Sequence, residues 1–272
     1  MSEQKNKINW FIGHMKKTVD VLEVKKKNID FIIEVVDARM PFGSSNQELL
    51  KIFNNKPIIK IAIKKDLINM KDKKDGFIYC SIKEHKEKNR ILNLIESKLK
   101  NKLDSLKKKG MVNPILIGMV VGLPNVGKSS LINYLANRKL VNVANKPGVT
   151  RKVENIKVHN NIYLLDTPGV FMKNVEDYNE GLNLALINCV NRNVVDKKDL
   201  GEHLFSIMKN NNLFIEIEKK YNIKDIETFQ EFINQLANKR NINLEINENE
   251  NNLILTFIKD MFDEGKNKIS LE

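Results

Sequence analysis

The chain has 272 residues and a formal net charge of +12, from 46 Lys and Arg against 34 Asp and Glu. Its two cysteines form no CxxC pair and join no Cys/His cluster, which argues against a disulfide-built fold and a structural zinc site and fits a reducing compartment. No apolar run reaches the ~18–20 residues that span a membrane, and the amino-terminal segment lacks the apolar core of a signal peptide. We therefore expect a cytoplasmic protein without a membrane partner.

The positive charge is concentrated in the first part of the chain. Residues 1–112 hold 26 basic and 14 acidic residues, whereas the two kinds balance in residues 113–272. A basic region favours a polyanionic partner such as RNA, through phosphate contacts and counterion release. The alternative is a composition effect, since 40 of the 46 basic residues are lysine.

Segments of helix and strand length alternate over the first 110 residues. A short helix is followed by a strand, a helix, two strands and a long amphipathic helix, predicted at 16–27, 30–38, 45–55, 57–63, 77–81 and 89–110. Apolar strands that alternate with helices predict a parallel-rich α/β sheet covered by helices on both faces.

The same pattern continues through the middle of the chain. An apolar strand at 114–122 enters a glycine-rich loop, a helix follows at 129–138, and two adjacent strands are predicted at 152–158 and 161–166. These segments extend the α/β domain.

The pattern changes near residue 178. Beyond it, apolar residues recur at three- and four-residue spacing, as in a small all-α domain. We expect an α/β domain over 1–178, with an amino-terminal extension at 1–28, and a helical domain over 179–272. The Asn/Glu-rich segment 246–252 is predicted to be a loop between two helices.

Residues 122–130 read GLPNVGKSS and contain the phosphate-loop pattern Gly-x4-Gly-Lys-Ser between an apolar strand and a helix. Its backbone N–H groups and the start of the helix attract phosphate. The expected nucleotide-binding residues here are Asn125, Val126, Gly127, Lys128, Ser129 and Ser130. The Lys128 ammonium would reach the β- and γ-phosphates, and the Ser129 hydroxyl would bind Mg²⁺.

A second phosphate-side motif, DTPG at 166–169, ends the last predicted strand. Asp166 is expected to hold Mg²⁺ through water, and the Gly169 N–H to meet the γ-phosphate. Thr150 lies between the two motifs, where a switch threonine would complete the Mg²⁺ shell; the alternative is an ordinary loop residue.

Two segments compete for recognition of the base, IKKD at 63–66 and DKKD at 196–199. The downstream segment follows only a three-residue apolar stretch and runs into a predicted helix, so it is typical of a helix start with Asp196 as the cap. The upstream segment ends an apolar strand of buried type, and we take it as the base reader.

The upstream assignment predicts a guanine-specific contact. Asp66 would accept from the guanine N1–H and amino group, a bidentate pair that adenine cannot offer. Lys64 would lay its aliphatic stem along the base, and Ser81 would begin a second base-contacting loop after the strand at 77–81.

The base reader then precedes the phosphate loop. A parallel sheet tolerates this order, because its termini lie near each other and new ends can open in a surface loop. The order resembles the circularly permuted GTPases of the Ras-like superclass, and within them the ribosome biogenesis GTPase A family. The motifs that carry the resemblance are WFIGHM (10–15), DARMP (37–41), KKDL (64–67), GLPNVGKSSLIN (122–133), KPGVTR (146–151), DTPGV (166–170) and GKNKISLE (265–272).

The resemblance covers essentially the whole chain. It implies a circularly permuted Ras-like domain followed by a helical domain, binding of GTP/GDP and Mg²⁺, and action on the assembling large ribosomal subunit. The chain departs from the family at two positions: Ile63 stands where the family has asparagine and Ile12 where proline is typical. Loss of the asparagine removes a polar contact, so guanine preference would rest on Asp66 with reduced affinity.

The resemblance also indicates how hydrolysis is assisted. Many GTPases place a water-orienting glutamine after the DxxG glycine, but this chain has Val170. The resemblance points instead to His14 as a catalytic group beside Lys128 and Thr150, with a structural or RNA-contacting role as the alternative. Asn125 resembles an asparagine that helps bind K⁺ beside the phosphates.

Two further arginines have open roles. Arg39 and Arg151 are alternative phosphate or RNA contacts, and the DARMP segment around Arg39 is equally compatible with an ordinary strand-end turn.

The resemblance implies a monomeric GTPase with slow intrinsic turnover that is stimulated by the ribosomal particle late in large-subunit assembly. The alternative is an RNA-binding assembly scaffold that holds nucleotide with little turnover. A GTPase that modifies small RNA is disfavoured, because no additional catalytic cysteine or metal cluster is present. Residues 180–272 hold 12 basic and 16 acidic residues, so RNA contact by the helical domain would need a local basic face.

Overall fold

The computed structural model describes residues 15–138, 155–170 and 175–272. These residues form two compact units. The sheet unit comprises 15–65, 73–138, 155–170 and Glu272, and the helical unit comprises 66–72 and 175–271.

The sheet unit is built on a sheet whose described strands have the order β3-β2-β1-β4-β6-β5. The strands are β1 (Phe31–Asp37), β2 (Ile58–Ile63), β3 (Ile78–Cys80), β4 (Leu116–Val121), β5 (Asn155–His159) and β6 (Ile162–Asp166). All neighbours pair in parallel except β5, which is antiparallel to β6. The carboxyl ends of the parallel strands therefore share one edge of the sheet.

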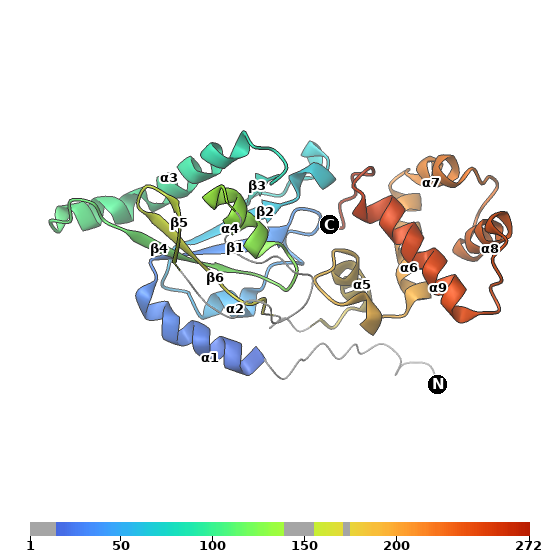
Figure 1. Ribbon diagram of the computed structural model, residues 1–272, viewed down its shortest axis with the longest axis horizontal. Helices are drawn as coiled ribbons and strands as arrows, with labels where there is room; N and C mark the ends of the chain where they lie inside the picture. Colours follow the sequence, from blue (N-terminus) through green and yellow to red (C-terminus); the bar gives the residue numbers. More distant parts are fainter. Residues whose placement is uncertain (1–14, 139–154, 171–174) are drawn as a thin grey trace. The chain divides into compact units, whose positions relative to one another are not determined.

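Helices cover both faces of this sheet. Those described are α1 (Met15–Lys25), α2 (Gln47–Lys51), α3 (Glu87–Lys108) and α4 (Lys128–Ala136). Helices α3 and α4 lie on one face and α1 and α2 on the other (Figure 1). The predicted α/β architecture with a parallel-rich sheet is confirmed.

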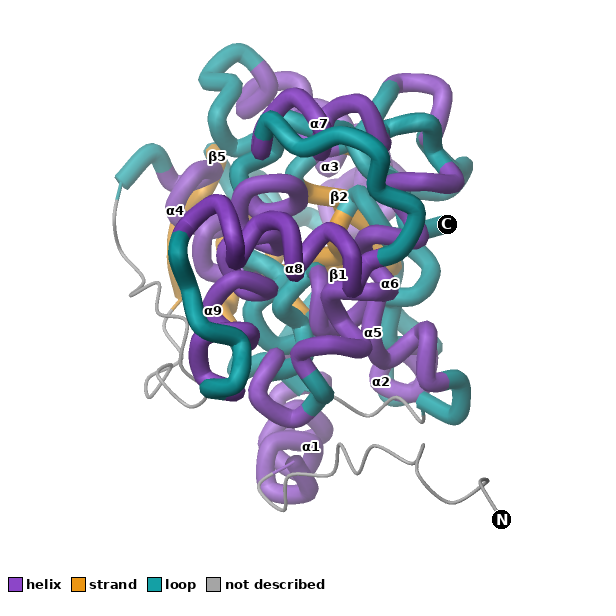
Figure 2. The backbone as a smooth tube through the Cα atoms, turned by 90° about the vertical axis from the view of Figure 1, so that its right-hand side faces the viewer, coloured by secondary structure: helices purple, strands orange, loops and turns teal. Residues whose placement is uncertain are grey.

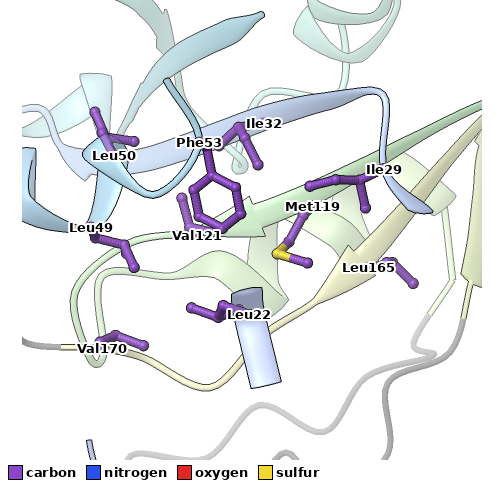
Figure 3. Close-up of a cluster of buried hydrophobic side chains, with 10 residues drawn as sticks. All are labelled: Leu22, Ile29, Ile32, Leu49, Leu50, Phe53, Met119, Val121, Leu165 and Val170. Carbon is purple, nitrogen blue, oxygen red and sulfur yellow. The ribbon is translucent and has the colours of Figure 1, made fainter. Parts of the chain in front are cut away.

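The hydrophobic core between the sheet and helices α1 and α2 contains residues from distant parts of the chain (Figure 3). Its buried members are Leu22, Ile29, Ile32, Leu49, Leu50, Phe53, Met119, Val121, Leu165 and Val170. Val170, which directly follows the DTPG motif, is part of this core. The end of that motif is therefore fixed by burial of apolar surface.

The helical unit contains α5 (Tyr178–Leu186), α6 (Lys197–Asn210), α7 (Phe214–Tyr221), α8 (Phe229–Arg240) and α9 (Asn247–Ile258). Helices α6, α8 and α9 contact one another (Figure 2). Aromatic rings fill the space between them, with centroids 5.1 Å apart for Phe232 and Phe257 and 5.7 Å apart for Phe205 and Phe229. Gly201 permits this packing, because a Cβ there would lie 2.5 Å from the Phe229 ring.

Two sequence predictions have clear outcomes in the helical unit. The helix start at DKKD is confirmed, because the Asp196 carboxylate accepts from the N–H groups of Lys198 and Asp199 at the start of α6. The loop predicted at 246–252 is wrong, because α9 begins at Asn247. Glutamates in the first turn suit the positive end of the helix dipole, and burial of the apolar residues that follow stabilises the helix.

Within the described ranges, no helix combines the length and apolar character needed to cross a bilayer.

Candidate nucleotide site

The loop between β4 and α4 has the backbone conformation that a phosphate loop needs. Gly122, Asn125 and Gly127 all have positive φ, at 151°, 54° and 112°. A Cβ on Gly122 would lie 2.4 Å from the Val35 carbonyl oxygen, so the loop passes too close to β1 for a side chain there. The loop therefore requires residues that tolerate positive φ, which are the two glycines and Asn125. This conformation turns successive N–H groups inward.

The Lys128 side chain folds back into this loop. Its ammonium donates to the carbonyl oxygens of Gly122, at 3.3 Å, and Leu123, at 2.9 Å, and the residue is only 6% exposed. The loop's own carbonyls therefore hold a positive charge beside its N–H groups. This is the environment in which an anionic phosphate is stabilised.

Ser129 and Asp166 meet at the start of α4. The Ser129 hydroxyl donates to Asp166 Oδ2 at 2.7 Å, whereas Asp166 Oδ1 is buried and has no hydrogen-bond partner among the described residues. Burial raises the pKa of Asp166 above its ordinary value, and the Ser129 hydroxyl and Lys128 only partly oppose this. A buried carboxylate oxygen without a partner beside a serine hydroxyl suits Mg²⁺, which prefers oxygen ligands and takes the remainder from water and phosphate.

The available side chains also indicate how a metal ion would be bound. Among the described residues, no group of three or more His, Cys, Asp or Glu could enclose a metal ion. Two oxygen-bearing side chains fit a cation held jointly with a nucleotide, as Mg²⁺ is in nucleotide-triphosphate sites.

The DTPG segment lies directly against the phosphate loop. The Thr167 hydroxyl donates to the Val120 carbonyl at 2.6 Å, and the Val170 N–H donates to the Gly122 carbonyl at 3.3 Å. A Cβ on Gly169 would lie 2.5 Å from the Pro124 Cα, so the two backbones are in van der Waals contact. Gly169 itself is exposed. The structure thus brings both phosphate-side motifs to one surface.

The end of β2 reaches the same loop. A Cβ on Gly127 would lie 2.4 Å from the Ile63 Cδ1, and Ile63 is fully buried. The position where the resemblance leads us to expect asparagine therefore makes an apolar contact with the phosphate loop. This contact places the carboxyl end of β2 beside the phosphate loop.

Lys64 is held by a buried charge cluster that sequence reasoning missed. Its ammonium donates to Asp37 Oδ2 at 2.7 Å, and Arg39 donates to both oxygens of the same carboxylate, with Nε and Nη2 each at 2.9 Å. Burial alone would raise the pKa of Asp37, but the charges of Arg39 and Lys64 outweigh it and hold the pKa far below its usual value. Arg39 is 4% exposed, which favours the strand-end alternative over phosphate or RNA contact.

The second predicted base loop begins at the end of β3. Ser81 is fully buried, and its N–H donates to Glu87 Oε2 at 3.0 Å, while its hydroxyl accepts from the Lys83 N–H at 3.4 Å. Lys65 forms an ion pair with Glu87. Asp66 belongs to the helical unit and lies in a 3₁₀ turn, Lys65–Leu67. Its contact with guanine stays a prediction.

The remaining predicted site residues divide into two groups. Val126 is buried, and Asn125 and Ser130 are half-buried at the loop and in α4. His14, Thr150 and Arg151, together with the departure at Ile12, lie outside the described residues.

A second missed feature connects β1 to the DTPG segment. The buried Asn46 side chain donates to the Val170 carbonyl at 3.0 Å, and the Asn46 N–H donates to Glu34 Oε1 at 2.8 Å. The run of polar residues at 44–46 was the available signal, but nothing local in the sequence identifies a partner 124 residues away.

This fold and site define a P-loop GTPase whose motifs occur in circularly permuted order. A family model described as "50S ribosome-binding GTPase" matches residues 118–248. The chain is 37% identical to the probable ribosome biogenesis GTPase A of Mycoplasma genitalium, over 98% of this chain and 97% of that protein. It is 33% identical to the ribosome biogenesis GTPase A of Bacillus licheniformis, over 86% of each.

Solved structures share the fold. The GDP-bound structure of TM YlqF aligns with a TM-score of 0.60 and 21% identity, over 93% of this chain and 98% of that one. The GNP-bound YlqF from T. maritima aligns with a TM-score of 0.56 and 20% identity, over 94% and 97%. The chain belongs to the ribosome biogenesis GTPase A family. It is a GTP-hydrolysing protein of ribosome assembly, as the sequence predicted.

Proposed function

We propose that the protein hydrolyses GTP late in the assembly of the large ribosomal subunit, with slow intrinsic turnover that the ribosomal particle accelerates. The observation that carries the proposal is the convergence of Lys128, the Ser129–Asp166 pair and Gly169 at the edge where Ile63 ends β2. The family model that matches residues 118–248 is named for binding to the 50S ribosome.

The phosphate side would work through backbone and charge. N–H groups over 125–130 and the Lys128 ammonium bind the phosphates, and Gly169 donates to the γ-phosphate. Ser129 and Asp166, with Thr150, would hold Mg²⁺, and the ion would supply positive charge beside the phosphates. The oxygen donors at Ser129 and Asp166 support this assignment.

The base side would read guanine through Asp66. Lys64 packs along the ring, and Ser81 begins the second loop. The Asp37 carboxylate supports this arrangement, because it fixes the Lys64 side chain beside the strand end.

Assistance to hydrolysis must come from outside the DTPG segment. Val170 is buried and apolar, so it cannot orient a water molecule. His14 is our candidate catalytic group, and a K⁺ ion held with the help of Asn125 would supply charge beside the phosphates. Activity that is identical in KCl and NaCl would remove the K⁺ part of the proposal.

The partner would be rRNA and ribosomal protein of the large-subunit precursor, bound by a cytoplasmic monomer. Residues 1–178 would form the GTPase domain and 179–272 the ribosome-contacting domain. Exposed lysines along α3 and just after it offer phosphate contacts from the GTPase domain as well; they are Lys98, Lys100, Lys107, Lys108 and Lys109.

Co-sedimentation with large subunits tests the proposal. The expected result is binding in the presence of a non-hydrolysable GTP analogue, weaker binding with GDP or no nucleotide, and faster GTP turnover with particles present. Nucleotide-independent binding together with unchanged turnover would contradict it.

The alternative, a scaffold that holds nucleotide as a state marker, is favoured by the apolar residues Ile63 and Val170. Multiple turnovers of GTP on large-subunit particles would exclude the scaffold.

A further inference from the structure

The nitrogen and the oxygen of the Asn46 side-chain amide are both hydrogen-bonded. Its Nδ2 donates to the Val170 carbonyl at 3.0 Å, and its Oδ1 accepts from the Leu49 N–H at 3.1 Å, which caps α2. The residue is 0% exposed. Because one end must donate and the other must accept, the amide has a single orientation that satisfies both neighbours.

A buried carboxylate holds Asn46 in place. Glu34 lies on β1 and accepts from the Asn46 N–H at 2.8 Å and from the Ser45 hydroxyl at 2.9 Å. Lys60 on β2 lies 3.7 Å from the same carboxylate. Asn46 is thus anchored to the middle of the sheet and not to a free loop.

Asn46 in turn completes the support of the DTPG segment. Both backbone groups of Val170 are hydrogen-bonded, since its N–H donates to the Gly122 carbonyl and its own carbonyl accepts from Asn46. The Gly122 contact comes from the phosphate loop itself. The Asn46 contact comes from the part of the chain that also carries the base-reading strand.

We propose that Asn46 is a positioning residue for recognition of the γ-phosphate. It fixes the backbone of Val170, and through it the preceding residue Gly169, so that the Gly169 N–H stays in the place where it donates to the third phosphate. The inference rests on the proposed role of Gly169. GDP lacks the γ-phosphate, so loosening this segment penalises only the triphosphate, through the entropy cost of ordering a segment that is otherwise preorganised.

The decisive variant is Asn46→Ser, tested in the full chain. Serine caps a helix about as well as asparagine but is too short to reach the Val170 carbonyl. Affinity for a non-hydrolysable GTP analogue should fall about tenfold, the worth of one well-placed hydrogen bond. Affinity for GDP should stay within about twofold, and far-UV circular dichroism should be unchanged.

Two other variants make the test specific. Asn46→Asp keeps the size and the acceptor for Leu49 but replaces the amide donor with an acceptor, so it should lose triphosphate preference at least as strongly. Gln47→Ala is the matched control, because the Gln47 side chain donates to Ser45 and leaves Val170 untouched. Its triphosphate-to-diphosphate ratio should equal that of the wild type.

The outcomes separate the two proposals. A normal ratio in Asn46→Ser or in Asn46→Asp, or an equal loss of affinity for both nucleotides, would overturn the role of Asn46 and leave the GTPase proposal intact. A wild-type protein that binds neither nucleotide would overturn the proposed function itself.

Discussion

Two aspartates end strands of the same parallel sheet, and their surroundings shift their pKa values in opposite directions. Asp37, at the end of β1, is buried among the positive charges of Arg39 and Lys64, which hold its pKa far below the usual value. Asp166, at the end of β6, is buried with one oxygen lacking a partner among the described residues, and its pKa is raised.

The difference separates a structural carboxylate from a functional one. Asp37 has all its partners within the protein, so its charge contributes to stability. Asp166 is short of positive charge, so its ionised form costs stability until a cation arrives. The carboxylate at the end of β1 is therefore complete without ligand, whereas under the proposed function the carboxylate at the end of β6 is completed by Mg²⁺.

Removal of the Asp37 carboxylate should destabilise the ends of β1 and β2, and this is the largest effect that we expect. Asp37→Ala removes the carboxylate that pairs with the buried Arg39 guanidinium, and loss of one member of a buried ion pair costs about 3–5 kcal/mol. Native-state hydrogen exchange of the β1 and β2 amides would measure this loss. The double variant Asp37→Ala/Arg39→Met should recover part of it, because the desolvated charge of Arg39 is gone as well.

The stabilising effect of Asp37, measured as the difference between the wild type and Asp37→Ala, should depend on pH. The folded pKa of Asp37 is depressed, so its stabilising effect is complete above about pH 5 and is lost as pH falls below about 4, where the unfolded carboxylate titrates. Glu84→Ala removes an exposed partner of Lys65 and serves as the control, with a loss below about 1 kcal/mol. An Asp37→Ala loss equally small would show that the cluster behaves like surface charges.

Asp166→Asn, at the end of β6, should have the opposite effect and stabilise the nucleotide-free protein. Asparagine keeps an acceptor for Ser129 and removes a charge whose raised pKa marks it as unfavourable at neutral pH. The nucleotide-free protein should melt about 2–4 °C higher, equivalent to about 1 kcal/mol. Mg²⁺-dependent GTP affinity should fall about tenfold, the loss of one charged ligand.

The pH dependence of the wild type gives an independent reading of Asp166. Mg²⁺ needs the ionised carboxylate, so metal-dependent GTP affinity should weaken as pH falls toward the raised pKa, while metal-free binding changes less. Titrations with and without Mg²⁺ at several pH values would measure both. If Asp166→Asn lowered the melting temperature, the carboxylate would belong to the structural kind after all.

The conformation of the phosphate loop could be predicted from the sequence far better than the contacts at the ends of β1 and β2, and the physical reason is locality. The phosphate loop is one continuous segment whose glycines and helix start are visible in order, so Lys128 and Ser129 could be assigned directly. The pairing of Lys64 with Asp37 spans 27 residues, and it could be foreseen only after the strands were placed side by side. Even the error at α9 has this origin, since burial of its later residues decided its start.

Ile63 ends β2 and lies beside the phosphate loop. Its replacement gives the smallest effect that we expect. Its side chain contacts Gly127 of the phosphate loop, and Ile63 occupies the position where the sequence resemblance leads us to expect asparagine. Ile63→Asn would exchange an apolar contact for a polar one, so GTP affinity should rise about fivefold, the net worth of one hydrogen bond. ATP affinity should not change if the gain involves guanine, and competition binding with both nucleotides measures this.

The variant should also lose stability, because a buried apolar side chain is replaced by a polar one. Equal gains for ATP and GTP would instead assign the asparagine to support of the phosphate loop, and no gain at all would mean that the apolar contact already performs that support.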